Sequence, residues 1–296
     1  MYFAEKRIGL NKGSTATLFV FGDIQLGSPG YKKEIFNEFK EDFLSTPNAY
    51  GLGLGDYGDF LRPSLRAKVG EALYQDDDAR IQLDDIVRDK IEKLGDEMSF
   101  MKGKLVGLNS GHHEWDFKDG TTSTHQLCHR LHTTYLGWSS YTVLKISNKK
   151  KLSKSNGGAT VSLKIYSTHG DGGSAYNSGD LAHLEKRIAP YWIADLYFRG
   201  HSSHGELAPL ELNDVTLRGE PRLIKKTRWI VNCPGMMNGY TDGAASYVEK
   251  KNMPPASLGY VKVELHYGNF RDISIDGDPI TGIKLQPMVV SPHTFR

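Results

Sequence analysis

Five times along the chain, an apolar run ends in small residues that are followed at once by an Asp or a His. The runs lead to Asp23, Asp56, His112, His169 and His201. A run of this kind is typical of a buried parallel strand, and glycines at its end let the backbone approach a bound group closely. Because the carboxyl ends of strands in an open α/β sheet form one ligand-binding edge, the repetition predicts a shared site at that edge.

Further polar residues stand beside these strand ends, namely Gln25, Asp59, His113 and His204. Any one of them alone is explained by a turn or a cap, but the repetition at five strand ends is not. Carboxylates and imidazoles without thiols suit Mn, Fe or Zn ions. Such a set can hold two ions about 3.5–4 Å apart with one carboxylate bridging, and the main use of such a pair is in-line attack on phosphorus.

The hydrophobic pattern predicts alternating strands and helices in a single domain that spans residues 1–296, with no Ser- or Pro-rich linker. Residues 206–296 are expected to form short strands and turns that complete a second sheet. Strands are predicted at 16–22, 50–55, 104–109, 139–147, 159–168 and 194–199, and helices at 32–44, 121–133 and 180–189.

Residues 61–104 are predicted to be a helical insert. One helical face is expected to contain Ile81, Ile86, Lys90, Leu94, Met98 and Met101, widened by Leu83, Val87 and Ile91. The acidic run Asp76, Asp77 and Asp78 precedes this helix. We interpret the run as a helix start that the helix dipole favours, rather than as a metal site.

Two other clusters offer alternatives to the site at the strand ends. His125, Cys128, His129 and His132 share one face of the predicted helix 121–133, but a single helix cannot surround a tetrahedral ion. We therefore expect a mixed packing and surface face there. Lysines between 149 and 154 indicate a solvated hairpin tip, with a phosphate-contacting loop as the alternative.

The composition is that of a soluble globular protein, with 39% apolar and 24% charged residues in 296. A net charge of +2 neither requires nor excludes a nucleic-acid partner. Two cysteines cannot form a disulfide framework, and residues 1–10 contain no apolar signal-peptide segment, so a cytoplasmic location is expected. No apolar run approaches the length of a membrane span, and nothing indicates an oligomeric state.

Taken in order, the motifs resemble those of the calcineurin-like metallophosphoesterase superfamily. They read Gly22-Asp23-Ile24-Gln25, Gly55-Asp56-Tyr57-Gly58-Asp59, Gly111-His112-His113-Glu114, His169-Gly170 and Gly200-His201-Ser202-Ser203-His204. The resemblance implies an α/β fold, a four-layer α-β-β-α sandwich in which two mixed β-sheets are flanked by helices. It also implies two divalent ions on one edge, with Mn²⁺ favoured over Fe, Zn or Ni. The stretch 232–259 and the loop after His169 resemble phage-encoded phosphoesterases, and for such a protein the location would be the host cytoplasm.

Carried over position by position, the resemblance makes Asp23 a ligand of the first metal and Asp56 the bridge between the two metals. His169 and His201 would bind the second metal. His113 would be the unligated acid that protonates or hydrogen-bonds the leaving oxygen. Asp59 would orient His113, and Glu114 would support the ligands from outside.

Three positions depart from the family pattern. Gln25 stands where the family has His, and its amide oxygen is a weaker ligand. His112 stands where the family has Asn, and imidazole is a better ligand there. His204 comes one residue late, which in extended backbone turns a side chain to the other face. A bulge or turn must re-aim it, or Ser203 or water fills the position, so the first metal is expected to bind more weakly than the second.

Three functions are compatible with these residues. The first is a two-metal phosphoester hydrolase in which a metal-bound hydroxide attacks phosphorus in line. A phosphodiesterase acting on nucleic acid is preferred within it, and a phosphomonoesterase or protein phosphatase stays open. The second is a metal-stabilised, non-catalytic scaffold, against which the pair His113 and Asp59 argues. The third is a nucleic-acid-binding protein that uses the lysine-rich tip alone.

Overall fold

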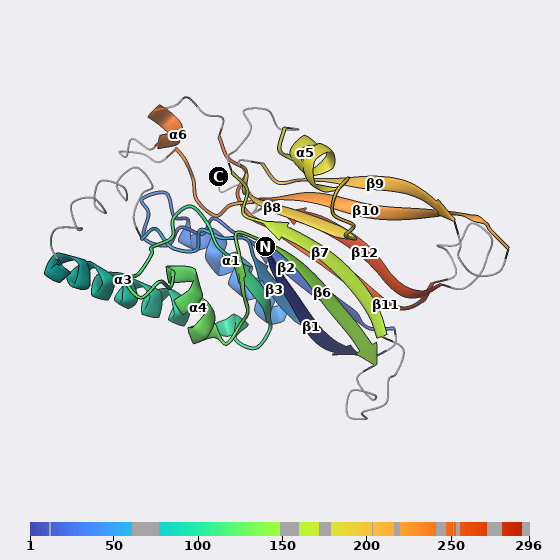
Figure 1. Ribbon diagram of the computed structural model, residues 1–296, viewed down its shortest axis with the longest axis horizontal. Helices are drawn as coiled ribbons and strands as arrows, with labels where there is room; N and C mark the ends of the chain where they lie inside the picture. Colours follow the sequence, from blue (N-terminus) through green and yellow to red (C-terminus); the bar gives the residue numbers. More distant parts are fainter. Residues whose placement is uncertain are drawn as a thin grey trace.

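The computed structural model consists of two β-sheets that lie face to face, with helices outside them (Figure 1). Each sheet has six strands. The structure describes residues 1–11, 13–60, 77–148, 160–171, 179–202, 204–215, 220–240, 247–250, 252, 255–270 and 280–291.

The first sheet, sheet A, has the strand order β1-β6-β7-β8-β10-β9. It is mixed, because β7, β8 and β10 run parallel while β6 pairs antiparallel with β7 and β9 pairs antiparallel with β10. Its strands are β1 (Tyr2–Leu10), β6 (Ser139–Asn148), β7 (Thr160–Thr168), β8 (Leu196–Ser202), β9 (Glu206–Val215) and β10 (Leu223–Pro234).

The second sheet, sheet B, has the strand order β12-β11-β2-β3-β4-β5. Strands β2, β3, β4 and β5 are parallel, so their carboxyl ends lie at one edge, while β11 and β12 join as an antiparallel extension. Its strands are β2 (Thr15–Phe21), β3 (Ala49–Gly53), β4 (Leu105–Asn109), β5 (Tyr135–Gly137), β11 (Tyr260–Phe270) and β12 (Ile280–Val290).

Helices cover the outer face of each sheet. On sheet B lie α1 (Lys33–Ser45), α3 (Asp77–Glu97), the short η1 (Ser99–Met101) and α4 (Ser123–Leu131), as Figure 1 shows for the three α-helices. On sheet A lie α5 (Gly179–His183) and the π-helix η3 (Leu184–Ile188), and α6 (Tyr247–Lys250) is a single turn. The expected α-β-β-α sandwich of two mixed sheets flanked by helices is confirmed.

The position of strand β2 between sheet A and the helices outside sheet B explains why its sequence is continuously apolar. Leu18 and Val20 point between the two sheets, whereas Phe19 and Phe21 point to the helices outside sheet B. Both faces of the strand are therefore buried, as in other parallel strands at the centre of an α/β sheet. The aromatic layer under α1 is completed by Phe36, Phe39 and Phe43.

Several predicted elements differ from the observed ones. Ile81 and Ile86 are 51% and 53% exposed, and Lys90 is exposed too, so the predicted helical face of the insert is wrong at these three positions. The buried face of α3 instead contains Val87, Ile91 and Leu94, which pack in the cluster outside sheet B. Helical spacing alone allows either set of apolar residues to form the buried face, and packing against α4 and the sheet decides which set is buried.

The chain after residue 206 does not form one second sheet of short strands. Strands β9 and β10 extend sheet A beside β8, whereas β11 and β12 extend sheet B beside β2. These strands contain 10 to 12 residues each. The predicted helix 180–189 is divided into α5 and η3. Strands β1 and β5 were not predicted. The acidic run does lead into a helix, because α3 begins at Asp77. The single domain stays a prediction.

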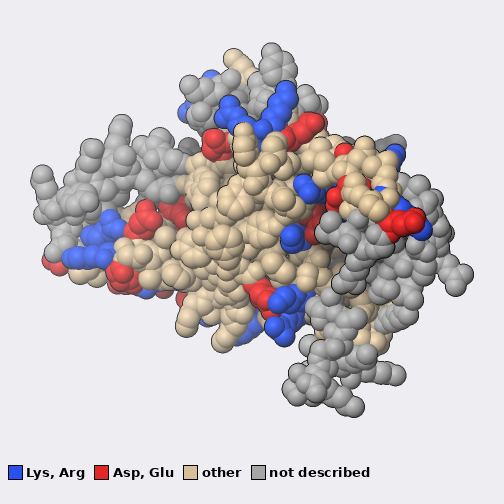
Figure 2. Space-filling model, turned by 45° about the vertical axis from the view of Figure 1, so that its right-hand side comes forward, with Lys and Arg blue, Asp and Glu red and all other residues tan. Residues whose placement is uncertain are grey.

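The surface in Figure 2 carries Lys and Arg in small groups beside Asp and Glu, with a broad uncharged area between them. This face therefore has no large field of one sign. None of the described helices combines the length and the hydropathy that crossing a lipid bilayer requires.

Candidate metal centre

Four of the predicted site residues adopt a left-handed backbone conformation that only glycine adopts without cost. Asp23, Gln25, Asp56 and His201 have φ angles of 46°, 48°, 53° and 49°. A side chain costs roughly 1–2 kcal/mol in this region, so such residues persist only where the surroundings hold them. The strained positions follow the predicted strand ends, and backbone strain of this kind is concentrated at functional sites.

Two glycines allow the loops of the site to approach one another. A Cβ atom on Gly55, which has a φ of 106°, would lie 2.7 Å from Nδ1 of His169. A Cβ atom on Gly111 would lie 2.1 Å from Oδ1 of Asp56. The glycines that precede these motif residues therefore serve close packing of the site, as the sequence pattern indicated.

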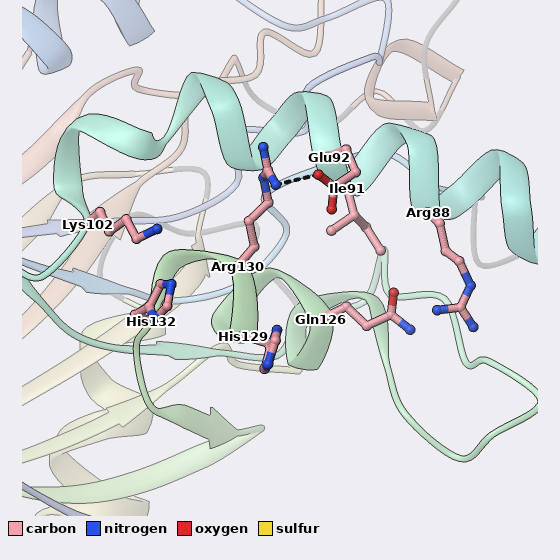
Figure 3. Close-up of a pocket in the computed structure, with 8 residues that line it drawn as sticks. All are labelled: Arg88, Ile91, Glu92, Lys102, Gln126, His129, Arg130 and His132. Carbon is pink, nitrogen blue, oxygen red and sulfur yellow. Dashed lines mark ion pairs between the residues drawn. The ribbon is translucent and has the colours of Figure 1, made fainter.

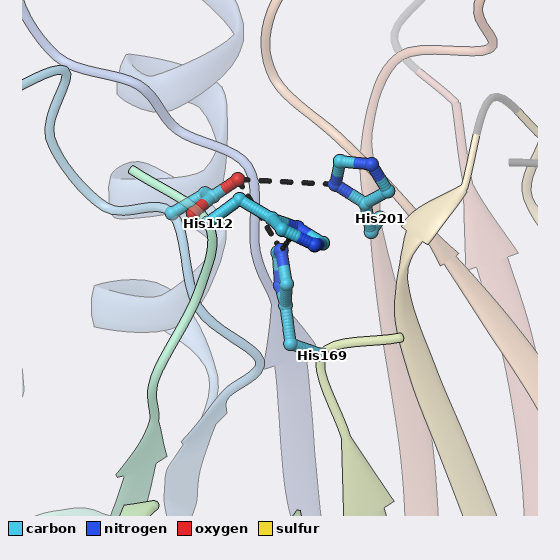
Figure 4. A group of neighbouring side chains, drawn as sticks. His112, His169 and His201 are labelled. Carbon is cyan, nitrogen blue, oxygen red and sulfur yellow. Dashed lines mark hydrogen bonds and ion pairs between the residues drawn. The ribbon is translucent and has the colours of Figure 1, made fainter. Parts of the chain in front are cut away.

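A compact cluster of potential metal ligands lies where β3, β4, β7 and β8 end. One ligand atom each from Asp56, His112, His169 and His201 lies within 4.8 Å of the others. The three imidazoles converge from three different segments (Figure 4). Among the described residues this is the only group of His, Cys, Asp and Glu with such spacing.

His169 is oriented for ligation by its second ring nitrogen. Its Nδ1 donates to the backbone carbonyl of Leu54 at 2.7 Å. Nε2 then points to Asp56 Oδ2 at 3.3 Å and to His112 Nδ1 at 3.0 Å. A carbonyl that fixes the protonated nitrogen of a histidine is the usual partner of a metal-binding imidazole.

The charges of the cluster favour one ionised carboxylate and a neutral imidazole. Burial raises the pKa of Asp56, but the imidazoles of His169 and His201 outweigh it and hold that pKa well below the usual range. Burial and the neighbouring imidazoles lower the pKa of His112 to about 4, so this ring is neutral at pH 7. Burial lowers and Asp56 raises the pKa of His169, with a net rise to about 9.

Asp23 lies beside the cluster and contacts one of its members, His201 on β8. Its Oδ2 accepts a hydrogen bond from the His201 backbone nitrogen at 3.0 Å, and its Oδ1 lies 3.8 Å from His201 Nδ1. Burial raises the pKa of Asp23, although the imidazoles oppose this effect. Asp23 and Asp56 are thus two buried carboxylates next to a group of imidazoles.

Gln25 lies at this edge, whereas His204 does not belong to the compact cluster. Gln25 is buried, and its backbone nitrogen donates to the carbonyl of Asp56 at 2.9 Å. Nε2 of His204 is buried without a hydrogen-bond partner among the described residues. Of the predicted ligands, the group Asp56, His112, His169 and His201 therefore converges, Asp23 lies beside this group, and His204 is outside it.

A bulge in β8 lies at His201, the first histidine of the last motif. The pairing of β8 with β10 shifts between Arg199 and Ser202, and His201 with its positive φ angle lies inside this shift. Ser202 Oγ then accepts from the backbone nitrogen of His204 at 3.2 Å. This bulge contains His201 and does not lie between His201 and His204, so the re-aiming of the late histidine stays a prediction, and Ser203 lies outside the described residues.

A buried ion pair beneath the bulge was not predicted. Arg199 Nη1 lies 2.9 Å from Asp180 Oδ1, and both side chains are almost completely buried. Ser202 Oγ donates to Asp180 Oδ2 at 2.7 Å. Residue type alone gave no signal for this network, because Asp180 reaches β8 from α5.

His113 and Asp59 form the pair that the motif resemblance implied. His113 Nδ1 lies 3.0 Å from Asp59 Oδ1, and the backbone nitrogen of His113 donates to Asp56 Oδ1 at 2.8 Å. Burial lowers the pKa of His113, but Asp59 and Asp56 raise it more, so the net pKa is above its usual value. Glu114 accepts from Thr122 Oγ1 at 2.7 Å and is turned to the start of α4.

Tyr57 fastens the loop of Asp56 to the neighbouring strand. Its hydroxyl accepts from the Gly55 nitrogen and donates to the Asn109 carbonyl, both at 3.0 Å. In the sequence, Tyr57 stands within the Gly-Asp motif without a predicted role. The hydrogen bond to Asn109 joins residues that are 52 positions apart, a contact that local pattern does not reveal.

The alternative metal site on α4 does not form. Cys128 is buried in the core outside sheet B, where burial raises the pKa of its thiol. His125 and His129 are exposed, and His132 is the left-handed C-cap of the helix. His129 and His132 instead line a cavity of about 540 Å³ between α3 and α4, together with Arg88, Lys102 and Arg130 (Figure 3).

Several predicted features lie outside the described residues. They are the lysine-rich tip 149–154, most of the glycine-rich loop after His169, and the first part of the insert up to residue 76.

Neither a protein-family model nor a curated protein matches this chain. Solved structures match with low similarity. Vps29 from Chaetomium thermophilum is 13% identical with a TM-score of 0.32, and the match covers 93% of this chain and 99% of Vps29. A predicted phosphoesterase from Streptococcus pneumoniae is 14% identical with a TM-score of 0.31, covering 94% and 99% of the two chains. A putative 5′-nucleotidase from Staphylococcus aureus is 11% identical with a TM-score of 0.38, covering 96% and 56%. These scores are too low to carry an argument about function.

Proposed function

We propose that this protein is a metal-dependent phosphoester hydrolase that acts on phosphodiesters, nucleic acid among them. The observation that carries the proposal is the convergence of Asp56, His112, His169 and His201 within 4.8 Å, with the His113–Asp59 pair beside it. Ligand clusters without thiols suit divalent ions such as Mn²⁺. The order of the motifs along the chain supports the same reaction class.

The residues at this edge fit a metal ion. Oδ2 of Asp56 and Nδ1 of His201 are buried, lie 3.9 Å apart and make no hydrogen bond of normal geometry among the described residues, although His169 Nε2 forms an ion pair with the same oxygen at 3.3 Å. Buried polar atoms normally form hydrogen bonds, so polar atoms without one at this edge indicate that a ligand binds there. The carbonyl that fixes His169 adds a second, independent sign of a metal site.

Asp56, His112, His169 and His201 would hold one divalent ion, and Asp23, Gln25 and His204 would complete a second site with Asp56 as the shared carboxylate. When bound, such ions lower the pKa of water and neutralise charge on phosphoryl oxygens. The ligand atoms of the first set lie within 4.8 Å of one another.

His113 supplies the proton to the leaving oxygen. Its Nδ1 donates to Asp59, which fixes the plane of the ring and leaves Nε2 for the substrate. A positioned acid of this kind typically contributes 10²–10⁴-fold to the rate. Because the backbone nitrogen of His113 binds Asp56, the acid is held at a fixed place relative to the ligand cluster.

The proposal is tested by adding Mn²⁺ back to metal-stripped protein and measuring release of p-nitrophenolate from a diester and from a monoester. We expect metal-dependent turnover that is faster with the diester. Faster turnover of the monoester would replace the diester preference by a phosphomonoesterase. Bound metal without turnover of either ester would contradict the proposal and favour a metal-stabilised scaffold.

A further inference from the structure

We propose that Trp138 is a stacking platform for the nucleobase of the substrate. The inference rests on the proposed phosphoester hydrolysis and adds the chemical class of the group attached to the phosphate. Trp138 is 42% exposed, whereas Trp115 is buried in the core.

Trp138 lies directly against the ligand cluster. Its ring centroid is 4.7 Å from that of His112 and 5.4 Å from that of His169. The ring planes are nearly perpendicular, at 88° and 84°, so neither imidazole stacks on the indole. A phosphoester held at the cluster would therefore place its organic substituent within reach of an exposed indole.

The backbone around Trp138 is fixed by the strands that deliver the ligands. The carbonyl of Trp138 accepts from the His169 nitrogen at 3.2 Å. The carbonyl of the preceding Gly137 accepts from the Ser110 nitrogen at 2.8 Å and from Asn109 Nδ2 at 3.0 Å. A large aromatic side chain on such a rigid segment is suited to bind a flat group without loss of much conformational entropy.

The chemistry of this surface favours a nucleobase over an aliphatic substituent. Indole is a large π-surface, and stacking of a base on an aromatic side chain tolerates every base, because each base has a π-face. Tyr2 provides a second exposed ring over Gly137, where a Cβ atom would meet the tyrosine ring at 2.4 Å. Two exposed aromatic side chains thus flank the same turn beside the metal centre.

The test compares two diesters with the same leaving group, the p-nitrophenyl ester of thymidine 5′-phosphate and methyl p-nitrophenyl phosphate. Trp138→Leu should lower the ratio of kcat/KM for the base-bearing over the base-free substrate about 10-fold, mainly through KM. Trp138→Phe should recover most of the ratio. A matched control is Tyr191→Leu, because Tyr191 is 77% exposed and precedes the opposite end of β8 from His201. An unchanged ratio in Trp138→Leu would overturn the inference.

A binding measurement separates this inference from the proposed reaction. Thymidine monophosphate should quench the tryptophan fluorescence of wild-type protein supplied with Mn²⁺, and Trp138→Phe should abolish this quenching. That result would support the platform even if neither ester were hydrolysed, in which case only the proposed function would fail. Quenching that is equal in both proteins, or absent from both, would overturn the platform even if hydrolysis were observed.

Discussion

Replacing His113 by Asn should separate metal binding from turnover. The His113 side chain is outside the four-atom ligand cluster, and its contact with Asp56 uses the backbone nitrogen, which the substitution keeps. We therefore expect the bound metal to be unchanged. The substitution removes the ring that donates to Asp59 from 3.0 Å and, in our proposal, protonates the leaving oxygen.

The expected loss follows from the role of His113 as a positioned acid. Loss of a general acid lowers the rate by 10²–10⁴, which corresponds to about 3–5 kcal/mol in the activation barrier. Asp59→Asn should cost less, about 10-fold, since the amide oxygen still accepts from Nδ1 but carries no charge. If Asp59 acts through His113, the double variant should lose no more activity than His113→Asn alone.

The assay is kcat/KM for a chromogenic diester, with metal content measured on the same samples by mass spectrometry. His129→Asn is a matched control, because this exposed histidine lies on α4 outside the cluster. Lost metal in His113→Asn would mean that the wrong histidine of the pair His112 and His113 has been assigned as acid. Losses that multiply in the double variant would refute the action of Asp59 through His113.

Three further results are expected. Tyr57→Phe should lower the free energy of unfolding in urea by about 1–3 kcal/mol, because two buried backbone groups lose their partner, and an unchanged midpoint would contradict this. Asp180→Asn should lower the free energy of unfolding by about 3 kcal/mol or more, because the buried Arg199 loses the carboxylate closest to it. Glu5→Gln, at an exposed ion pair, should leave the unfolding midpoint unchanged, and equal effects of the two substitutions would contradict the role of burial. In a two-site metal titration the converged cluster should bind more tightly than the site that includes Gln25, and equal affinities would oppose this order.

The sequence was most informative where the structure is local. An apolar run followed by glycine and Asp56 reports a buried strand and its end within a few residues, and the repetition at His169 and His201 placed those ends at one edge. A bulge near the last motif was one of the expected alternatives, and the bulge that the structure has lies at His201 rather than between His201 and His204.

The sequence was least informative where contacts between distant segments determine which side chains are buried and which segments lie together. The face of α3 depends on packing with α4, so Ile81 and Ile86 look as apolar as Val87 and Ile91 yet are exposed. Strand β1 is an edge strand with a largely exposed pattern, and it resembles a polar tail in sequence. Trp138 follows the three-residue strand β5, and only the fold brings it to His112.

The most direct test of the account is an anomalous difference map from crystals soaked in Mn²⁺. We predict a manganese peak bonded to Asp56, His112, His169 and His201, with any second peak nearer Asp23 and at lower occupancy. A soaked crystal with no peak at these four side chains, or with its strongest peak elsewhere on the protein, would contradict the assignment of this edge as a metal centre.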